Sequence, residues 1–294
     1  MRFGIIGNLD KPGLPKAVGH LLEGLEDSGT DYLVDKKILT LLAGGDEGER
    51  ASRGRDYEVC LKESDMVVAF GGDGTILAAA RSVGGRGTPI LGVNLGKLGF
   101  LAEFAPEELD QAIEDILAKN YLVEDRLVLE ATSPSLPERV FRAVNDVVVD
   151  KSRSPRIVDL EAHIDGAYAV TYRGDGLIIS TPTGSTAYAL SNNGPIVTPT
   201  SGVIGITPIS PHTLSGRPLI VPEQSTIRVV VQAESNEVLF SADGQVEAFL
   251  TPPVEFTIRK ATHPLRLVKR TDRSYFDVLR AKLLWGQDAR EIRD

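Results

Sequence analysis

Cysteine, long apolar runs and clusters of basic residues are all scarce in this chain of 294 residues. A single cysteine, Cys60, excludes an internal disulfide and a zinc site built from cysteines. The longest apolar stretches, such as residues 202–209, are far shorter than the roughly 18–20 residues that cross a bilayer. The N-terminus lacks the apolar core of a signal peptide. We therefore expect a cytoplasmic protein without a membrane partner.

Basic residues are outnumbered by acidic ones, 32 to 41, which gives a formal net charge of −9. No run of Lys and Arg forms a footprint for nucleic acid, so we expect no nucleic-acid partner. An acidic protein binds phosphate through local groups such as backbone N–H groups, helix N-termini, a few arginines or a divalent metal. The hydrophobic content of 42% excludes disorder as the main state.

Several common catalytic motifs are also absent. The chain contains no G-x-G-x-x-G dinucleotide fingerprint and no H-E-x-x-H zinc motif. Gly96-Lys97 resembles part of a Walker A loop, but Leu98 stands where that motif needs Ser or Thr. Gly184-Ser185-Thr186 lacks the first glycine of a nucleophile elbow. These absences disfavour metal hydrolases and serine hydrolases.

The first 120 residues alternate between strand-like and helix-like patterns. Strands are predicted at 3–7, 31–34, 65–70 and 89–93, and helices at 15–25, 37–42 and 76–83. This alternation is typical of βαβ units with a parallel sheet, so the fold class of this part is α/β. The charged, glycine-rich segment 44–56 has no periodicity and predicts a mobile surface loop.

After residue 120 the pattern becomes all-β. The predicted strands lie at 121–131, 139–149, 157–164, 167–172, 176–180, 217–221, 226–232, 237–241, 254–259 and 265–270. Asp165-Gly166 and Asp243-Gly244 are signals for type I′ hairpins. We expect an α/β domain over 1–120 and about 271–294, and an antiparallel, β-rich domain over 121–270 with a short helix near 183–191. A C-terminal helix at 275–285 is expected to return to the first domain.

A glycine-rich segment, Gly71-Gly72-Asp73-Gly74-Thr75, follows a predicted buried strand and opens a predicted helix. Parallel sheets bind ligands at this end of a strand, and such turns present N–H groups to anions. A carboxylate repels phosphate, so Asp73 suits a metal ion or the proton of a hydroxyl being phosphorylated. The alternative is a tight turn in which Asp73 caps the helix. The segment 94–101, NLGKLGFL, is either a second close approach beside this loop or a plain connector.

Two further polar segments lie in the predicted β-rich domain. At Asn145-Asp146 a strand ends, and Asp146 either accepts hydrogen bonds from a pair of ribose hydroxyls or belongs to a solvated strand end. The segment 181–191, TPTGSTAYALS, concentrates hydroxyl groups at a predicted strand-to-helix junction. Such a junction is typical of sites that bind adenine, ribose or phosphate, although helix capping explains one or two of the hydroxyls.

Together and in this order, these motifs resemble the NAD kinase family. The resemblance rests on G-G-D-G-T at 71–75, N-x-G-x-x-G-F-L at 94–101, N-D at 145–146, D-G-L-I-I-S-T-P-T-G-S-T-A-Y at 175–188 and S-A-D-G-Q at 241–245. It extends to the S-Y-F…L-L-W tail at 274–285 and is weakest over residues 1–64. The family implies a Rossmann-like α/β N-terminal domain, a β-rich C-terminal domain, and a site between them that is completed across a subunit interface.

The resemblance also implies roles for individual residues, with Asp73 as the proton acceptor. NAD would contact Asp73, Gly74, Asn145, Asp146, Arg156, Arg173, Asp175, Thr186, Ala187, Tyr188, Ala189, Leu190, Ser191 and Gln245. The phosphoryl donor would contact Gly71, Gly72, Gly74, Thr75, Asn94, Gly96 and Lys97. Many members of the family carry a basic residue where this chain has Ala78, which leaves Arg81 or Lys97 to neutralise the donor.

The implied reaction phosphorylates the 2′-hydroxyl of the adenosine ribose of NAD and gives NADP. ATP or polyphosphate would be the donor, with a divalent metal, Mg²⁺, bridging its phosphates, and the implied assembly is a homodimer or homotetramer. Two alternatives are a lipid kinase that shares the glycine-rich loop and a non-catalytic NAD-sensing module. The chain has no amphipathic basic segment for a membrane surface, which disfavours the lipid kinase. A carboxylate in a phosphate loop lowers affinity, which disfavours a pure binder.

Overall fold

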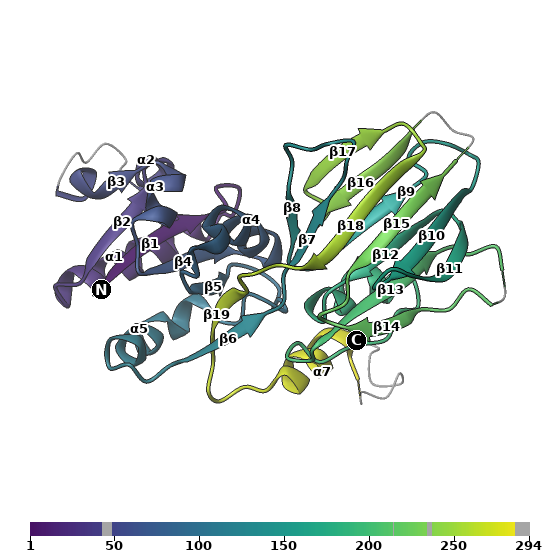
Figure 1. Ribbon diagram of the computed structural model, residues 1–294. Coiled ribbons are helices and arrows are strands. Elements are labelled where there is room, and N and C mark those ends of the chain that lie inside the picture. The colour runs from purple at the N-terminus through teal and green to yellow at the C-terminus, as the bar shows by residue number, and fades with distance from the viewer. Residues whose placement is uncertain (43–48, 214, 234–236, 286–294) are drawn as a thin grey trace. The chain divides into compact units, whose positions relative to one another are not determined.

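The computed structural model describes residues 1–42, 49–213, 215–233 and 237–285 (Figure 1). The chain forms two compact units. Unit 1 comprises Met1–Asp125 and the described residues from Arg266 onward, and unit 2 comprises Arg126–Leu265. None of the helices in the described ranges is both long enough and apolar enough to cross a membrane.

Unit 1 is built on a seven-stranded sheet with the order β3-β2-β1-β4-β5-β19-β6. The strands are β1 (Arg2–Gly7), β2 (Asp31–Asp35), β3 (Gly54–Arg55), β4 (Met66–Gly71), β5 (Ile90–Asn94), β6 (Leu122–Arg126) and β19 (Leu265–Lys269). The pairs from β3 through β19 are parallel. The predicted strands of the first domain and their parallel arrangement are therefore confirmed. The predicted strand at 265–270 and the first part of the predicted strand at 121–131 were assigned to the wrong sheet, because β19 pairs in parallel with β5 and β6 is the next strand of this sheet.

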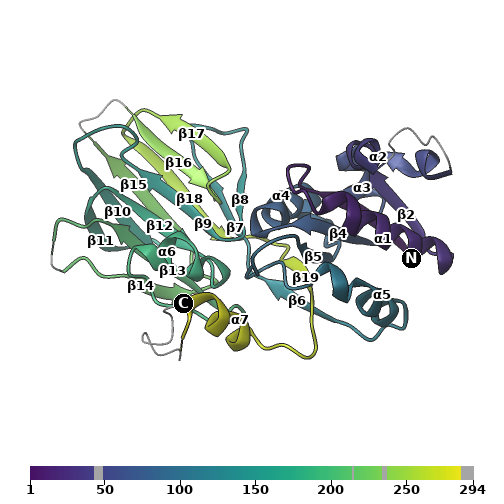
Figure 2. The same ribbon diagram turned by 180° about the vertical axis from the view of Figure 1, so that it is seen from behind.

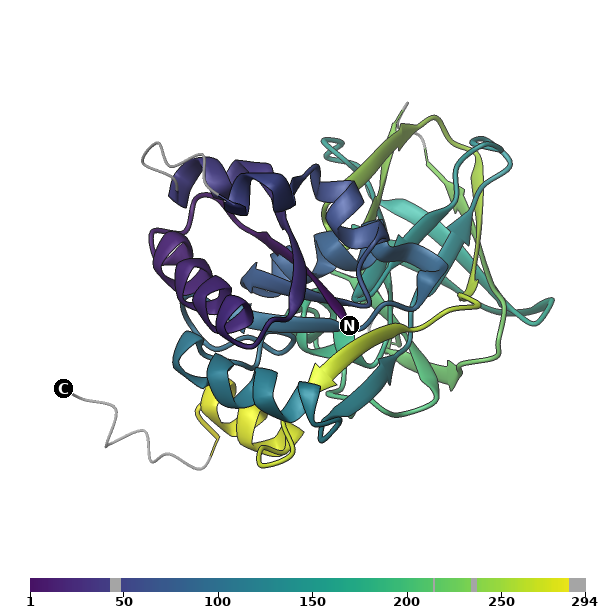
Figure 3. The same cartoon turned by 90° about the vertical axis from the view of Figure 1, so that its left-hand side faces the viewer.

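Helices cover both faces of this sheet, as Figure 3 shows. They are α1 (Leu14–Asp27), α2 (Lys36–Leu42), α3 (Tyr57–Lys62), α4 (Asp73–Val83) and α5 (Leu109–Leu117), with 3₁₀ turns η1 (Glu49–Arg53), η2 (Gly84–Arg86) and η3 (Pro106–Glu108). Unit 1 also contains the C-terminal helix α7 (Tyr275–Leu283). The apolar stripes of α1 and α5 pack on the face that carries Phe3 and Ile5, whereas α3 and α4 cover the other face. Helices α3 and α5 were not predicted. Helix α7 begins where Ser274 caps it in a capping box with Asp277.

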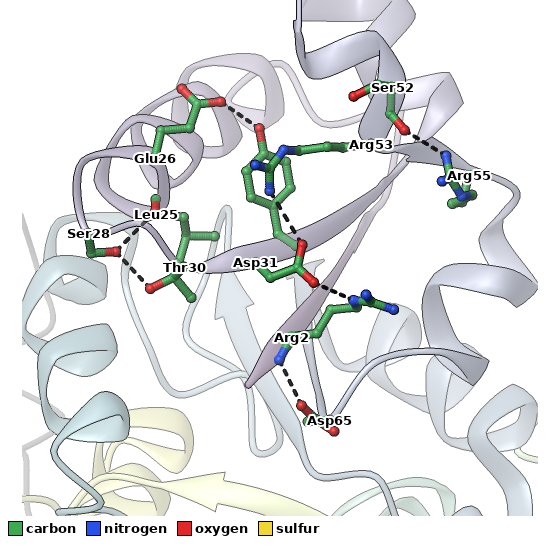
Figure 4. A network of polar contacts seen from close by, with 11 residues as sticks. Arg2, Leu25, Glu26, Ser28, Thr30, Asp31, Ser52, Arg53, Arg55 and Asp65 are labelled. Carbon is green, nitrogen blue, oxygen red and sulfur yellow. Dashed lines mark hydrogen bonds and ion pairs between the residues drawn. The ribbon is translucent and has the colours of Figure 1, made fainter.

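The segment predicted as a mobile loop, 44–56, is in part ordered secondary structure. Residues 43–48 lie outside the described residues, but η1 and β3 follow them directly. Arg50 holds η1 on α1 with two hydrogen bonds to the Glu26 carboxylate, 2.8 and 2.6 Å. The Arg53 guanidinium lies 4.5 Å from the centre of the Tyr32 ring and pairs with Asp31 (Figure 4). These pairs depend on the fold, so charge density alone was a poor indicator of a loop.

Unit 2 contains two six-stranded sheets, with the orders β11-β10-β15-β18-β7-β8 and β14-β13-β12-β9-β16-β17. Their strands are β7 (Leu129–Thr132), β8 (Phe141–Ala143), β9 (Asp146–Asp150), β10 (Val158–Ile164), β11 (Ala167–Gly174), β12 (Gly176–Ser180), β13 (Val203–Ile209), β14 (Leu219–Pro222), β15 (Ile227–Gln232), β16 (Val238–Ala242), β17 (Val246–Leu250) and β18 (Val254–Lys260). The pairs are antiparallel, which confirms the predicted β-rich class. Strands β13 and β17 were not predicted.

One hydrophobic core joins the inner faces of these two sheets, as expected of a β-sandwich. Phe240 lies at its centre, with ring centroids 4.5 Å from Phe256 and 4.6 Å from Phe141. Both Asp-Gly pairs form the predicted turns, and all four of their residues have positive φ. The helix predicted near 183–191 is divided into a 3₁₀ turn, η4 (Thr183–Thr186), and a short helix, α6 (Tyr188–Ser191) (Figure 2).

Candidate active site

The glycine-rich loop connects β4 to α4 at the carboxyl end of the unit 1 sheet. Gly72 is the N-cap of α4 and Asp73 is its first residue. The N–H group of Leu95 donates to the carbonyl of Gly71 over 3.0 Å, and Gly71 pairs with Asn94. The structure therefore brings the two predicted donor loops side by side. The segment 94–101 is not a plain connector.

The Asp73 carboxylate accepts three backbone hydrogen bonds from this second loop. Oδ2 accepts from Phe100 at 2.9 Å, and Oδ1 accepts from Leu101 at 2.9 Å and Ala102 at 3.2 Å. The interpretation of Asp73 as a side-chain cap of its own helix is therefore wrong. Each carboxylate oxygen accepts about two hydrogen bonds. Oδ1 is filled by these donors, and Oδ2 keeps one acceptor position for a ligand.

Gly99 makes this arrangement of the two loops sterically feasible. A Cβ atom at position 99 would lie 2.0 Å from Oδ1 of Asp73. Any other residue there would push the loop away from the carboxylate. The other predicted donor residues lie nearby: Asn94 accepts from the N–H of Gly96 at 2.9 Å, and Lys97 is exposed. Arg81 is in the last turn of α4, which places its backbone about 12 Å along the helix from Asp73.

In unit 2, three chain segments meet around Asn145 and Asp146. The Asp243 carboxylate, in the β16–β17 turn, accepts from the N–H groups of Val144 at 3.1 Å, Asn145 at 2.7 Å and Asp146 at 3.3 Å. The N–H group of Thr181 donates to the carbonyl of Asn145 over 2.9 Å. Gly184 approaches the same carbonyl so closely that a Cβ atom would lie 2.0 Å from its oxygen.

Asp146 is the buried acid of this cluster, with 5% of its surface exposed. Burial and, to a smaller extent, the neighbouring Asp243 carboxylate raise the pKa of its carboxyl from 3.8 to about 7, against the backbone N–H of Tyr188, which lowers it. The predicted residue Gln245 is exposed and follows Asp243 in the same turn. The structure thus brings Asn145, Asp146, the segment 181–188 and Gln245 together.

The hydroxyl groups of residues 181–186 mostly support this turn instead of facing solvent. Thr181 donates to the carbonyl of Val144 at 2.6 Å, Ser185 to that of Pro182 at 2.6 Å, and Thr186 to that of Thr183 at 3.1 Å. The hydroxyl-rich composition therefore reflects local structure more than ligand contact. Among the predicted NAD contacts that follow, the side chains of Tyr188 and Ser191 are exposed, those of Ala187 and Leu190 are half-buried, and Ala189 is buried against Val148 and Ile178.

Three predicted NAD contacts lie near the opposite ends of β9 and β12. Arg173 pairs with Asp159 at 2.7 Å, Asp175 pairs with Lys151 at 2.7 Å, and Arg156 is exposed on the loop after β9. Asp146 pairs with Ser180, whereas Asp150 pairs with Gly176. Four residues of strand separate these two ends by about 13 Å. Within one chain the structure does not bring these three residues to Asn145.

Asp243 is the residue that sequence reasoning missed. Its Asp-Gly pair was used as a turn signal and as part of the S-A-D-G-Q motif, and neither use assigned a role to the carboxylate. The N–H groups that it binds come from residues nearly 100 positions earlier in the chain. Within the described ranges, no group of three or more His, Cys, Asp or Glu side chains converges as a metal site.

Comparison with known protein families divides the chain at nearly the same place as the structure. Residues 3–121 match the model of the ATP-NAD kinase N-terminal domain, and residues 144–270 match that of the ATP-NAD kinase C-terminal domain. An NAD kinase from Geobacter metallireducens is 47% identical over 288 residues, which are 97% of this chain and 99% of that protein. An NAD kinase from Syntrophotalea carbinolica is 40% identical over 288 residues, which are also 97% of this chain and 99% of that protein.

Two solved structures resemble the chain over nearly its full length. The yeast NADH kinase complexed with NADH superposes with a TM-score of 0.89 and 26% identity, covering 98% of this chain and 89% of that one. An NAD kinase from Archaeoglobus fulgidus in complex with ATP superposes with a TM-score of 0.75 and 25% identity. The match covers 96% of this chain and 99% of that one. These likenesses and the family models agree on the two-domain fold.

We expect Gly99→Ala to release the second loop from Asp73, because the new methyl group occupies the position of the carboxylate. Hydrogen exchange should accelerate at the amides of residues 100–102, and the free energy of unfolding should fall by roughly 1–3 kcal/mol. Gly24→Ala is the matched control, because nothing lies within 4 Å of that position in α1. It should leave exchange at 100–102 unchanged. Equal exchange in Gly99→Ala and wild type would contradict the proposed steric role of Gly99.

We expect Asp146→Asn to change the pH dependence of stability. An acid with a raised pKa holds its proton more tightly in the folded state, so ionisation of Asp146 lowers the wild-type free energy of unfolding as pH rises towards about 7. Relative to wild type, the free energy of unfolding of the variant, measured in urea, should rise by roughly 1–4 kcal/mol between about pH 4 and about pH 7. Parallel curves for the two proteins would show that Asp146 does not titrate in this range.

Proposed function

Because this chain belongs to the NAD kinase family, we propose that it transfers the terminal phosphoryl group of ATP to the 2′-hydroxyl of the adenosine ribose of NAD. Members of this family are ATP-dependent phosphotransferases, so the chain is an enzyme of that class. Beyond this enzyme class, we propose which hydroxyl accepts the phosphoryl group, what role each residue has and where the hydroxyl proton goes. The family membership also disfavours the lipid kinase as an alternative.

The open acceptor position on Oδ2 of Asp73 is the observation that carries the proposal. Three backbone amides fix the carboxylate at the end of β4, so a hydroxyl that donates to Oδ2 is held in one orientation. In the reaction, a bond forms between the ribose oxygen and phosphorus while the bond from phosphorus to the leaving ADP oxygen breaks. The hydroxyl proton passes to Asp73 as the new bond forms, and it then leaves to solvent.

Recognition of NAD is assigned to the residues that the resemblance implies. In unit 2 the buried carboxyl of Asp146 would bond ribose hydroxyls, and the exposed ring of Tyr188 would contact the adenine face. Arg156, Arg173 and Asp175 would serve the dinucleotide bound by a neighbouring subunit. Their separation from Asn145 within one chain supports that assignment. A homodimer or homotetramer is therefore part of the proposal.

The donor phosphates would bind the N–H groups at the start of α4, where the helix dipole favours negative charge. The exposed Lys97 is the nearby cation of this loop, since Arg81 is about two turns of α4 away. Mg²⁺ commonly binds through substrate phosphates and one or two carboxylates. Asp73 is the only carboxylate of the glycine-rich loop. A bound Mg²⁺ would neutralise charge on the donor phosphates. Use of polyphosphate and a cytoplasmic location stay predictions from the sequence.

We expect Asp73→Asn to retain NAD binding and to lose about 10²–10⁴-fold in turnover, because the amide cannot accept the hydroxyl proton. Calorimetry with NAD and an assay of NADP formation measure the two effects separately. Asp65→Asn is the control. Asp65 is exposed and lies directly before β4, the strand that leads into the glycine-rich loop, and the variant should keep wild-type turnover. Wild-type NADP formation by Asp73→Asn would overturn the assignment of Asp73. Loss of NAD binding in that variant would show that Asp73 acts mainly by holding the loop at residues 100–102 in place.

A further inference from the structure

Within unit 1, the C-terminal helix α7 contacts the loop that holds Asp73. The ring of Tyr275, the first residue of α7, lies 6.5 Å from that of Phe100 between centroids, at an angle of 40°. Nζ of Lys282 lies 5.3 Å from the centre of the same Phe100 ring. These distances are typical of aromatic pairs and of cation–π contacts. Tyr275 and Lys282 are seven residues apart on the helix, so they lie on one face of it, and Phe100 contacts both.

Phe100 is also the residue whose backbone N–H group donates to Oδ2 of Asp73, at 2.9 Å. Oδ2 is the oxygen to whose open acceptor position we assign the substrate hydroxyl. The half-buried ring of Phe100 is joined to its backbone through Cβ alone, so a displacement of the ring is transmitted to this N–H group. The side chain that α7 contacts and the N–H group that orients Oδ2 therefore belong to one residue.

The segment that leads into α7 contacts the same loop three residues after Phe100. Arg273 donates to the backbone carbonyl of Glu103 at 3.2 Å. Lys269, at the end of β19, forms an ion pair with the buried Glu103 carboxylate. Two sets of contacts thus join the C-terminal segment to the loop, one at each end of the three residues whose N–H groups bind the Asp73 carboxylate.

Helix α7 is itself held in place at its start and along its buried face. Oγ of Ser274 accepts from the N–H of Asp277 at 3.3 Å, and the N–H of Ser274 donates to the Asp277 carboxylate at 2.9 Å. Val278 and Leu279 are buried. A helix of nine residues is marginal in isolation, so capping and burial are what keep α7 ordered. An ordered helix can fix the position of a loop that it contacts.

We propose that α7 is a positioning element for the proton acceptor of the reaction, and that Phe100, Tyr275 and Lys282 are its positioning residues. They act through the N–H groups of residues 100–102, which orient the Asp73 carboxylate. This inference rests on the proposed function, because it takes Asp73 as the proton acceptor. When the contacts to the Phe100 ring are lost, the carboxylate is correctly oriented for a smaller fraction of the time. Turnover then falls, whereas both substrates still bind.

The first test removes the charge of Lys282 and keeps its length and its helix propensity. We expect Lys282→Met to lower kcat for NADP formation about two- to fivefold, the effect of losing one exposed cation–π contact. KM for NAD and for ATP should stay within twofold of wild type. Lys282→Arg keeps a cation at the ring and should retain wild-type kcat. Arg280→Met is the matched control, because the exposed Arg280 is a cation of the same helix that pairs with Asp277, and it should leave kcat unchanged.

A double-mutant cycle separates a contact with the Phe100 ring from a general effect of charge. Phe100→Leu removes both ring contacts and should lower kcat about tenfold. In that background Lys282→Met should cause no further loss, because the ring that the cation contacts is absent. Losses that multiply, an unchanged kcat in Lys282→Met, or a loss that Lys282→Arg shares would overturn the proposal. Lys282 is exposed, so its variants remain testable if Phe100→Leu does not fold.

Hydrogen exchange at the amides of residues 100–102 distinguishes failure of this inference from failure of the proposed function, because it needs no NADP formation. Exchange should accelerate in Lys282→Met and Phe100→Leu and stay at the wild-type rate in Lys282→Arg and Arg280→Met. Faster exchange in the first two variants supports the attachment of the loop by α7 even if the protein forms no NADP. Wild-type exchange in both overturns it, and so does faster exchange with an unchanged kcat.

Discussion

The hydrogen bonds between the Asp73 carboxylate and the backbone of residues 100–102 hold the whole unit 1 site together. They join the start of α4 to the loop that follows β5, and they require a glycine at position 99. Each charge-assisted bond of this kind contributes about 1.5–3 kcal/mol. The same bonds leave one acceptor position of Oδ2 open, so the interaction that stabilises the loops also fixes the position of the acceptor to which we assign the substrate hydroxyl.

Unit 2 uses the same kind of interaction with a different consequence. Asp243 accepts from three consecutive N–H groups, 144–146, and so holds the turn in front of β9. Its negative charge then lies beside the buried Asp146 and adds to the effect of burial in raising the pKa of that carboxyl to about 7. One carboxylate orders the backbone, and the other is left with a proton affinity suited to exchange with a ligand near neutral pH.

Local patterns predicted the parts of the fold that depend on local forces. The buried strands and the Asp-Gly turns follow from apolar periodicity and positive φ, and the position of the glycine-rich loop follows from the strand before it. The strand β19 was assigned to the wrong sheet because nothing in its own sequence specifies a partner 177 residues earlier, as in the pair Leu267 and Ile90. Asp243 was missed for the same reason: the N–H groups that its carboxylate accepts from become its neighbours only in the folded chain.

A chain with a net charge of −9 is an unexpected binder of two polyanions, and the local arrangement of charges resolves the difficulty. Asp73 and Asp243 are each bound by three N–H groups, and Glu103 and Glu108 pair with Lys269 and Arg270. A carboxylate satisfied in this way presents little unpaired negative charge to a ligand. Other acidic side chains are screened by salt beyond about 8–10 Å. The phosphate binding that we propose would therefore depend on the few N–H groups and cations at the sheet edge, and the net charge would not oppose it.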